Sequence, residues 1–322
     1  MNKHFLIAKK EFQDIFRNRT FSIMLGLLLT LTVTSILVST LVFKSQVTQY
    51  ENSLAVLQSL GKMPVDAAPK LFPLNLLRGV VDYLEIIGAI IGILLGYLSI
   101  AKEKSTKTFK LLLSRPITKK DILVGKIFGN LLFVSLMVLF VAAVILASFY
   151  AIGGITLTAV ELMKILLFVI ISIVYVMVFF TLSFFLSVQQ KTLSNALIIC
   201  FVIWLVFVLV LPQIGDTMDP DNQVPGGFFK SIGFDRPHEK AVLAKFSGYE
   251  NTRNFIEQLS ITKQYERAAF ALFGIKPMYN EMMLPEILVD QLFNIISLFV
   301  LFTIGIFSDA YIMHKDKQFL RG

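Results

Sequence analysis

The sequence predicts an all-α integral membrane protein with six transmembrane helices, and three observations support this fold class. Hydrophobic residues make up 56% of the 322 residues and charged residues only 16%, with a mean hydropathy of +0.73. This composition is unlike that of a soluble globular domain. Several apolar runs reach about 20 residues, enough to cross a hydrocarbon core of roughly 30 Å as helices. The alternating short strands of a membrane barrel are not seen in the sequence.

Six apolar runs define the expected spans. They cover residues 21–43, 84–101, 127–152, 165–188, 196–211 and 287–313. The first run is longer than the apolar region of a cleaved signal peptide and follows a polar or amphipathic stretch, so we expect an uncleaved anchor that is also the first span. The single cysteine, Cys200, lies in the fifth run, where we expect a buried structural thiol.

The distribution of charge predicts which side of the membrane each loop faces. The segments 1–20, 102–126, 189–195 and 314–322 hold 17 Lys or Arg and five acidic residues. The segments 44–83, 153–164 and 212–286 hold 13 Lys or Arg and 14 acidic residues over about twice the length. Because short loops rich in Lys and Arg stay cytoplasmic, we expect a multi-pass protein of the cell membrane with both termini cytoplasmic. The net charge of +8 then reflects topology, and we expect no nucleic-acid partner.

Segments outside the spans are also expected to be helical. Residues 1–20 are typical of an amphipathic helix at the membrane interface, with an apolar face formed by Phe5, Ala8, Phe12, Ile15 and Phe16. In the outer loops, residues 45–60 are predicted to form a helix ended by Gly61, and residues 250–273 one long helix ended by Gly274. We expect the outer loops to form a compact helical cap, with apolar contacts from Phe255, Leu259, Ala268, Phe270 and Phe273.

The loop 102–126 is the most informative segment. It carries eight Lys or Arg against two acidic residues, and it also has an apolar side formed by Phe109, Leu111, Leu112, Leu113 and Ile117. Such a segment either lies on the bilayer or binds a partner protein. Pro116 disfavours helical geometry in the residue before it, and Thr118 with Asp121 resembles a capping box. The pattern predicts a helix, a sharp corner at residues 114–116, and a second helix that leads into the third span.

The residues of this loop also resemble the signature of ABC-2 type permeases, in particular the six-span branch that includes the copper-enzyme-maturation permease NosY. The matching residues are Glu103, Thr108, Leu111, Leu112, Leu113, Ser114, Arg115, Pro116, Ile117, Ile122, Gly125 and Lys126. The chain departs from the signature where Lys107 replaces a small residue and Phe109 replaces a leucine. In outline, the amphipathic N-terminal segment and six spans match the same family.

The resemblance implies a transport subunit without a nucleotide site of its own, whose loop after the second span is a coupling helix for a cytosolic ABC ATPase. The implied ATPase-coupling residues are Glu103, Thr108, Phe109, Leu112, Leu113, Arg115 and Pro116. Glu103 is expected to pair with a cation on the ATPase or on the N-terminal helix. The implied partners are that ATPase, a second permease copy or a paralogue, the lipid bilayer and an extracytoplasmic partner. No cofactor is expected on this chain, and ATP and Mg²⁺ are expected on the ATPase.

The residues themselves also argue against an enzyme. A P-loop needs glycine and then Ser or Thr around a Gly-Lys pair, but Lys120 and Ile127 occupy those positions around Gly125-Lys126. The three histidines, His4, His238 and His314, are too scattered to predict a metal site. The energy for transport must then come from a separate subunit or from an ion gradient.

A second candidate site consists of ionisable and polar residues near the outer ends of two spans. Glu85, Asp290 and Asn294 form this possible intramembrane polar site, with contact to lipid headgroups as the alternative interpretation. An ion-coupled secondary transporter would need charges in the middle of its spans, and none is present there. We therefore expect an ABC exporter. The alternatives are an ABC-driven mechanical transmitter that acts on an outer partner, and the ion-coupled transporter.

Overall fold

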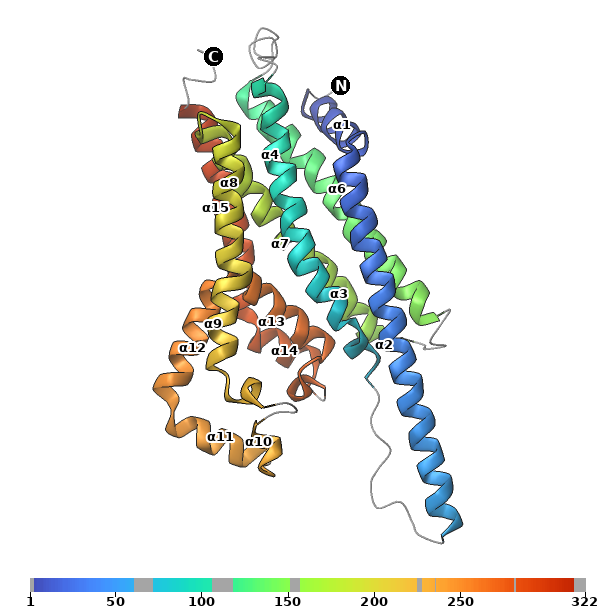
Figure 1. Ribbon diagram of the computed structural model, residues 1–322. Coiled ribbons are helices and arrows are strands. Elements are labelled where there is room, and N and C mark those ends of the chain that lie inside the picture. Colours follow the sequence, from blue (N-terminus) through green and yellow to red (C-terminus); the bar gives the residue numbers. More distant parts are fainter. Residues whose placement is uncertain are drawn as a thin grey trace.

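The computed structural model describes residues 3–60, 72–105, 118–150, 157–224, 228–234, 236–280 and 282–315. These residues contain no strands, and six helical segments are long and apolar enough to cross a membrane, which confirms the predicted fold class. The segments are Arg19–Ser59, Pro73–Ser105, Lys119–Ser148, Ala159–Gln189, Leu193–Met218 and Leu292–Lys315. In Figure 1, α1 (Lys3–Phe16) and the end of α15 (Leu292–Lys315) lie at one end of the bundle, and α10–α12 lie at the other.

The helix that contains the first span continues well beyond the residues predicted for that span. Helix α2 (Arg19–Ser59) is one continuous helix of 41 residues, where we expected a span over 21–43 and a separate helix over 45–60. No Gly or Pro interrupts the chain between these two parts, so nothing local ends the helix. At 1.5 Å per residue α2 is about 60 Å long, and its last turns project beyond the bundle (Figure 1).

The second span packs against α7 (Ala159–Gln189) through a row of glycines. The span begins with η1 (Pro73–Leu77), α3 (Arg78–Tyr83) and the π-helical η2 (Leu84–Gly88), and continues as α4 (Ala89–Ser105). A Cβ added at Gly92 would collide with the carbonyl oxygen of Val176, and one at Gly96 with that of Phe180. The glycines therefore allow the two backbones to approach closely, as small residues do in membrane helix pairs.

The N-terminal helix α1 is docked on α6 (Lys119–Ser148) rather than lying only on the bilayer. A Cβ at Gly125 would lie 2.6 Å from the Cβ of Ile7, and one at Gly129 would lie 2.7 Å from the carbonyl oxygen of Ala8. Of the predicted apolar face, Ile15 is buried and Ala8 and Phe12 are half-buried, whereas Phe5 and Phe16 are 64% and 52% exposed. The amphipathic helix is confirmed, and its packed face includes three of the five predicted residues.

Helix α6 starts at the capping box that the sequence predicts. The backbone N–H of Asp121 donates to Thr118 Oγ1 at 3.2 Å, and the N–H of Thr118 donates to Asp121 Oδ2 at 2.8 Å. The reciprocal bonds fix the first turn of α6. The corner predicted at 114–116 lies outside the described residues.

The fifth span and a helical subdomain follow α7. The span consists of α8 (Leu193–Leu205), the π-helical η4 (Val206–Val210) and α9 (Leu211–Met218). The described helices between the fifth and sixth spans are η5 (Pro220–Gln223), α10 (Phe228–Ser231), α11 (Arg236–Lys245), α12 (Ser247–Leu259), α13 (Ile261–Phe273), η6 (Pro277–Tyr279) and α14 (Leu284–Asp290).

The prediction of one helix over 250–273 is wrong. The chain breaks at Ser260, whose Oγ accepts a hydrogen bond from the N–H of Lys263 at 3.1 Å and caps α13. Helix α13 is almost entirely buried and packs against α7 and α15. It ends at Gly274 with φ of 67°, the left-handed C-cap that the sequence predicts.

The two halves of the predicted helix also differ in burial. Phe255 and Leu259 on α12 are exposed, whereas Ala268, Phe270 and Phe273 on α13 are buried. Only the second half of this region therefore contributes its apolar side chains to a packed core. The outer loops form a helical subdomain, but α13 belongs to the bundle rather than to a cap above it.

Candidate functional site

Of the seven predicted ATPase-coupling residues, the structure describes Glu103. The other six, Thr108, Phe109, Leu112, Leu113, Arg115 and Pro116, lie outside the described residues. The described chain ends at Ser105 on α4 and resumes at Thr118 before α6, so both flanks of the predicted loop are defined. The candidate site is therefore built from these flanks.

The two flanks are joined by a buried ion cluster. The Lys126 ammonium on α6 is almost fully buried and lies 2.9 Å from Glu11 Oε1 on α1 and 3.0 Å from Glu103 Oε1 on α4. It also donates to the carbonyl oxygen of Ser99 at 2.6 Å. Three oxygens thus match the three N–H donors of the ammonium. A buried charge is tolerated when it is paired and hydrogen-bonded in this way, so the cluster ties α1, α4 and α6 together.

Two further ion pairs connect α1 to α4 around this cluster. Lys10 Nζ lies 4.0 Å from Glu103 Oε1, and Lys102 Nζ lies 2.8 Å from Asp14 Oδ2. The expected cationic partner of Glu103 on the N-terminal helix is thus Lys10, but Lys126 is closer. The sequence analysis used Lys126 only as part of the family signature. A signal for its buried role was available, because Lys126 and Asn130 are four residues apart. This spacing places the two polar residues on one face of a largely apolar helix.

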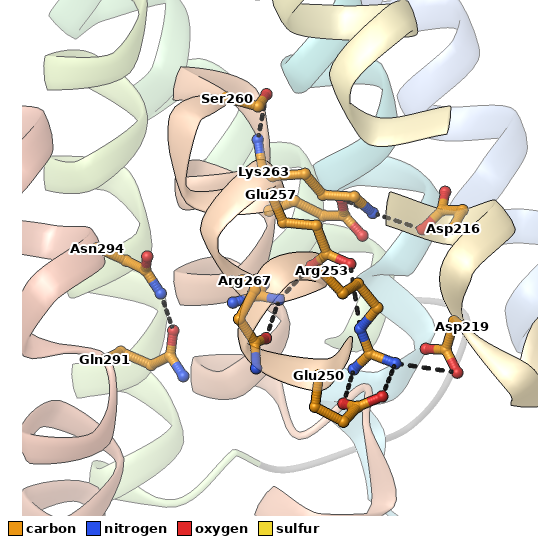
Figure 2. Close-up of polar contacts among 12 residues, drawn as sticks. Asp216, Asp219, Glu250, Arg253, Glu257, Ser260, Lys263, Arg267, Gln291 and Asn294 are labelled. Atoms are coloured by element: carbon orange, nitrogen blue, oxygen red, sulfur yellow. Dashed lines mark hydrogen bonds and ion pairs between the residues drawn. The ribbon is translucent and has the colours of Figure 1, made fainter. Parts of the chain in front are cut away.

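The structure separates the three residues of the predicted polar site into two groups. Asn294 Nδ2 donates to Gln291 Oε1 at 2.7 Å, as Figure 2 shows, and Gln291 Nε2 donates to Asp290 Oδ2 at 2.7 Å. The Tyr279 hydroxyl donates to the same oxygen of Asp290 at 2.7 Å. Asp290 is exposed and Asn294 is buried. This network holds the junction between α14 and α15, and Glu85 is not part of it.

Glu85 lies in the π-helical η2, which faces α13. The carbonyl oxygen of Glu85 accepts a hydrogen bond from the Tyr175 hydroxyl at 2.7 Å, and the Tyr175 ring stacks on Tyr265 of α13 with centroids 4.3 Å apart. On the other π-helical segment, η4, the carbonyl oxygen of Phe207 accepts from Ser260 Oγ at 2.5 Å. Irregular backbone in a membrane protein needs such partners. A hydroxyl on or beside α13 therefore satisfies one backbone carbonyl in each of the two π-helical segments.

An ion-pair network cross-links α9, α12 and α13 (Figure 2). Arg253 lies 3.1 Å from Glu250 and 3.4 Å from Asp219. Two further cations belong to the network. Arg267 pairs with Glu257, and Lys263 pairs with Asp216 at 3.1 Å and with Glu266 at 2.7 Å. Burial lowers the pKa of Lys263, but the two carboxylates more than offset this and raise it above its usual value. Each of the five carboxylates thus lies against a cation, and the network joins the three helices to one another.

Two features were not predicted as sites. Asp309 on α15 is fully buried, and neither of its carboxylate oxygens has a hydrogen-bond partner among the described residues. Glu11 on α1 is likewise buried against Lys126. In the sequence, both resemble ordinary charges near the ends of helices. Within the described ranges, no three His, Cys, Asp or Glu side chains come together in an arrangement that would hold a metal ion.

Comparison with known proteins identifies one family. The model of the ABC-2 family transporter protein matches residues 5–312. The match runs from α1 almost to the end of α15, so it includes the buried ion cluster, all six spans and the outer helices. No curated protein matches the chain.

Proposed function

The chain belongs to the ABC-2 family of transporter proteins, and we propose that it is the permease of an exporter whose separate cytosolic ATPase docks on residues 102–126. Membership of the family makes it the membrane-spanning subunit of an ABC transporter. The direction of transport, the docking segment and the assembly are the parts that we propose. ATP and Mg²⁺ bind to the ATPase in this proposal, and no cofactor binds to this chain.

The observation that carries the proposal is the buried cluster of Glu11, Glu103 and Lys126. Glu103 lies at the start of the proposed docking segment and Lys126 at its end, and their side chains are 3.0 Å apart. The two ends of the loop are therefore fixed to one another and to α1. A displacement of the loop by the ATPase would move α4 and α6 together, because separating them would expose buried charges.

The packing of the bundle supports transmission across the membrane. Helix α4 is in close contact with α7 through the glycine row, and α7 in turn packs against α13 and α15. Because packed helices with little free space move as units, a shift of α4 would reach α13 at the opposite end. We expect a complex of two permease copies, or one copy and a paralogue, with two ATPase subunits.

The runner-up function is mechanical transmission to an extracytoplasmic partner, and the outer subdomain supports it. Five aromatic side chains of this subdomain are exposed: Phe228, Phe234, Phe246, Tyr249 and Phe255. Exposed apolar groups of this kind are typical of protein interaction surfaces. Membership of the ABC-2 family favours both of these ATP-driven functions, export and mechanical transmission, over an ion-coupled transporter.

Co-expression with an ATPase of the ABC class tests the proposal. We expect a tagged chain to retain the ATPase through purification, with two copies of each by mass. The Pro116→Ala variant should retain the ATPase but lose stimulation of ATP hydrolysis by substrate, because the angle between the loop and the third span is loosened. Purification of an active permease without any ATPase would contradict the proposal.

A further inference from the structure

A cavity of about 840 Å³ opens at the end of the bundle that carries α1. It lies between the elbow that joins α1 to α2, the last turns of α4 and the first turns of α6. Its volume falls within the range of small-molecule sites. Three groups of side chains that line the cavity determine which ligand it can bind. They are buried hydrogen-bond acceptors, exposed arginines and apolar residues from the spans.

The first group contains two buried oxygen atoms that accept no hydrogen bond from the described residues. Glu103 is 4% exposed and Asn130 is 0% exposed, and both line the cavity. Asn130 Nδ2 donates to Ser99 Oγ at 3.1 Å and to the carbonyl oxygen of Lys126 at 2.8 Å, so both of its N–H groups are used. Glu103 Oε2 and Asn130 Oδ1 have no hydrogen-bond partner among the described residues. Buried acceptors rarely stay unpaired. Both oxygens are almost completely covered in the structure, so a ligand in this cavity reaches them when the lining side chains shift, and it should then be a hydrogen-bond donor.

The second and third groups lie at the mouth of the cavity and along its side. Arg17 and Arg19 flank the elbow, are exposed and make no side-chain hydrogen bond or ion pair with the described residues. A guanidinium fits the oxygens of a phosphate in a bidentate manner. The apolar wall consists of Phe21, Leu95, Leu98 and Leu193, which belong to the spans. The cavity therefore crosses from the level of headgroups to that of hydrocarbon.

We propose that this cavity binds a lipid whose headgroup carries both a primary ammonium and a phosphate, as in phosphatidylethanolamine. The ammonium donates to Glu103 Oε2 and Asn130 Oδ1, the phosphate accepts from Arg17 and Arg19, and an acyl chain lies along the apolar wall. A trimethylammonium headgroup has no N–H to donate, and phosphatidylglycerol has no cation. The lipid proposal does not rest on the docking of an ATPase, although Lys102, Glu103, Ser105 and Lys126 line the cavity and belong to the proposed docking segment.

Native mass spectrometry of the full-length, delipidated chain tests the headgroup. Phosphatidylethanolamine, phosphatidylcholine and phosphatidylglycerol are added separately, and the concentration for half-occupancy of one lipid is measured. We expect phosphatidylethanolamine to bind about tenfold or more tightly than either of the others, because each lacks a charge-assisted donor. Equal binding of phosphatidylethanolamine and phosphatidylcholine overturns the proposal, and so does binding of soluble O-phosphoethanolamine as tight as that of the lipid.

Variants assign the contacts. Asn130→Leu should reduce the preference for phosphatidylethanolamine over phosphatidylcholine, because Glu103 remains as the second acceptor, whereas Arg17→Gln combined with Arg19→Gln should weaken both lipids alike. The matched control is Lys9→Gln, an exposed cation on α1 that does not line the cavity, and it should leave all three affinities unchanged. An unchanged preference in folded Asn130→Leu overturns the assignment. If that variant does not fold, the comparison of the three lipids on the unaltered chain still tests the proposed headgroup.

Discussion

At the scale of single residues, Lys126 shows how one cation organises the end of the bundle. It is surrounded by three oxygens from two other helices, one from α1 and two from α4, and two of these oxygens belong to carboxylates that are themselves buried. Taking ions out of water is unfavourable unless each charge is compensated. The three helices are therefore positioned relative to one another by the need to keep this cluster intact.

Replacing Lys126 should be far more harmful than replacing an exposed lysine on the same helix. We expect Lys126→Met to lower the free energy of unfolding by about 3–5 kcal/mol, because two buried carboxylates lose their cation. Lys120→Met is the matched control, since Lys120 is exposed, and it should change stability by less than about 0.5 kcal/mol. Thermal unfolding of the purified proteins measures both.

The same cluster offers a second, more stringent comparison. A triple variant with Glu11→Leu, Glu103→Leu and Lys126→Met removes every charge together, and it should be more stable than Lys126→Met alone because no uncompensated carboxylate is left. If Lys126→Met and Lys120→Met unfold at the same temperature, the cluster does not organise the helices.

At the scale of elements, close backbone packing of α4 on α7 is the main contact between the second and fourth spans. Gly92 is the clearest example, because a Cβ there would meet the Val176 carbonyl oxygen and lie 3.1 Å from the Cβ of Phe179. Neither neighbour has a flexible end that can move away. The helices themselves must therefore separate to accept any side chain at this position.

One added methyl group tests this packing. Gly92→Ala should destabilise the protein by about 1–3 kcal/mol, which is typical of overpacking. Gly26 lies in the first span, and a Cβ added there would have no neighbouring atom within 4 Å, so Gly26→Ala should be neutral or should stabilise by up to about 1 kcal/mol through helix propensity. Thermal unfolding in the same detergent compares the two, and equal shifts would mean that α4 and α7 are not in close backbone contact at Gly92.

Elements whose ends depend on local chemistry were predictable from the sequence. The capping box at Thr118 and the left-handed cap at Gly274 both use residues within one turn of the helix end. The break at Ser260 was not predicted, because the hydroxyl also bonds to the Phe207 carbonyl, more than fifty residues away. The closer of the two cationic partners of Glu103 was not predicted for the same reason, since Lys126 becomes a neighbour only after α4 and α6 pack.

At the scale of the whole molecule, the outer part of the chain divides into an integral helix and a peripheral group. Helix α13 is buried between spans, so a deletion over 219–281 would remove part of the core. Helices α10 and α11 lie farther out (Figure 1), and the described residues of α11 are mainly exposed. We expect the peripheral group, rather than α13, to recruit or gate the substrate.

Replacing residues 228–245 by a short Gly-Ser linker separates these roles. Asp219 lies 3.4 Å from Arg253, so the chain on either side of the replaced segment stays close together and the bundle should keep its unfolding temperature within about 4 °C. Substrate transport by the reconstituted complex should fall, while ATPase binding should not change. Full transport in this variant would exclude recruitment by the peripheral group, and unfolding of the bundle would exclude its peripheral position.

Docking of an ATPase on residues 102–126 through apolar anchors is central to the proposed function. Co-purification of the ATPase with Leu112→Ala and with Lys120→Ala tests it most directly. Loss of a buried leucine costs about 1.5–3 kcal/mol, whereas an exposed charge contributes less than about 1 kcal/mol. We therefore predict that Leu112→Ala loses most of the ATPase and that Lys120→Ala retains it. Normal ATPase binding by Leu112→Ala together with loss of binding by Lys120→Ala would make this loop an electrostatic membrane anchor and would contradict docking through apolar anchors.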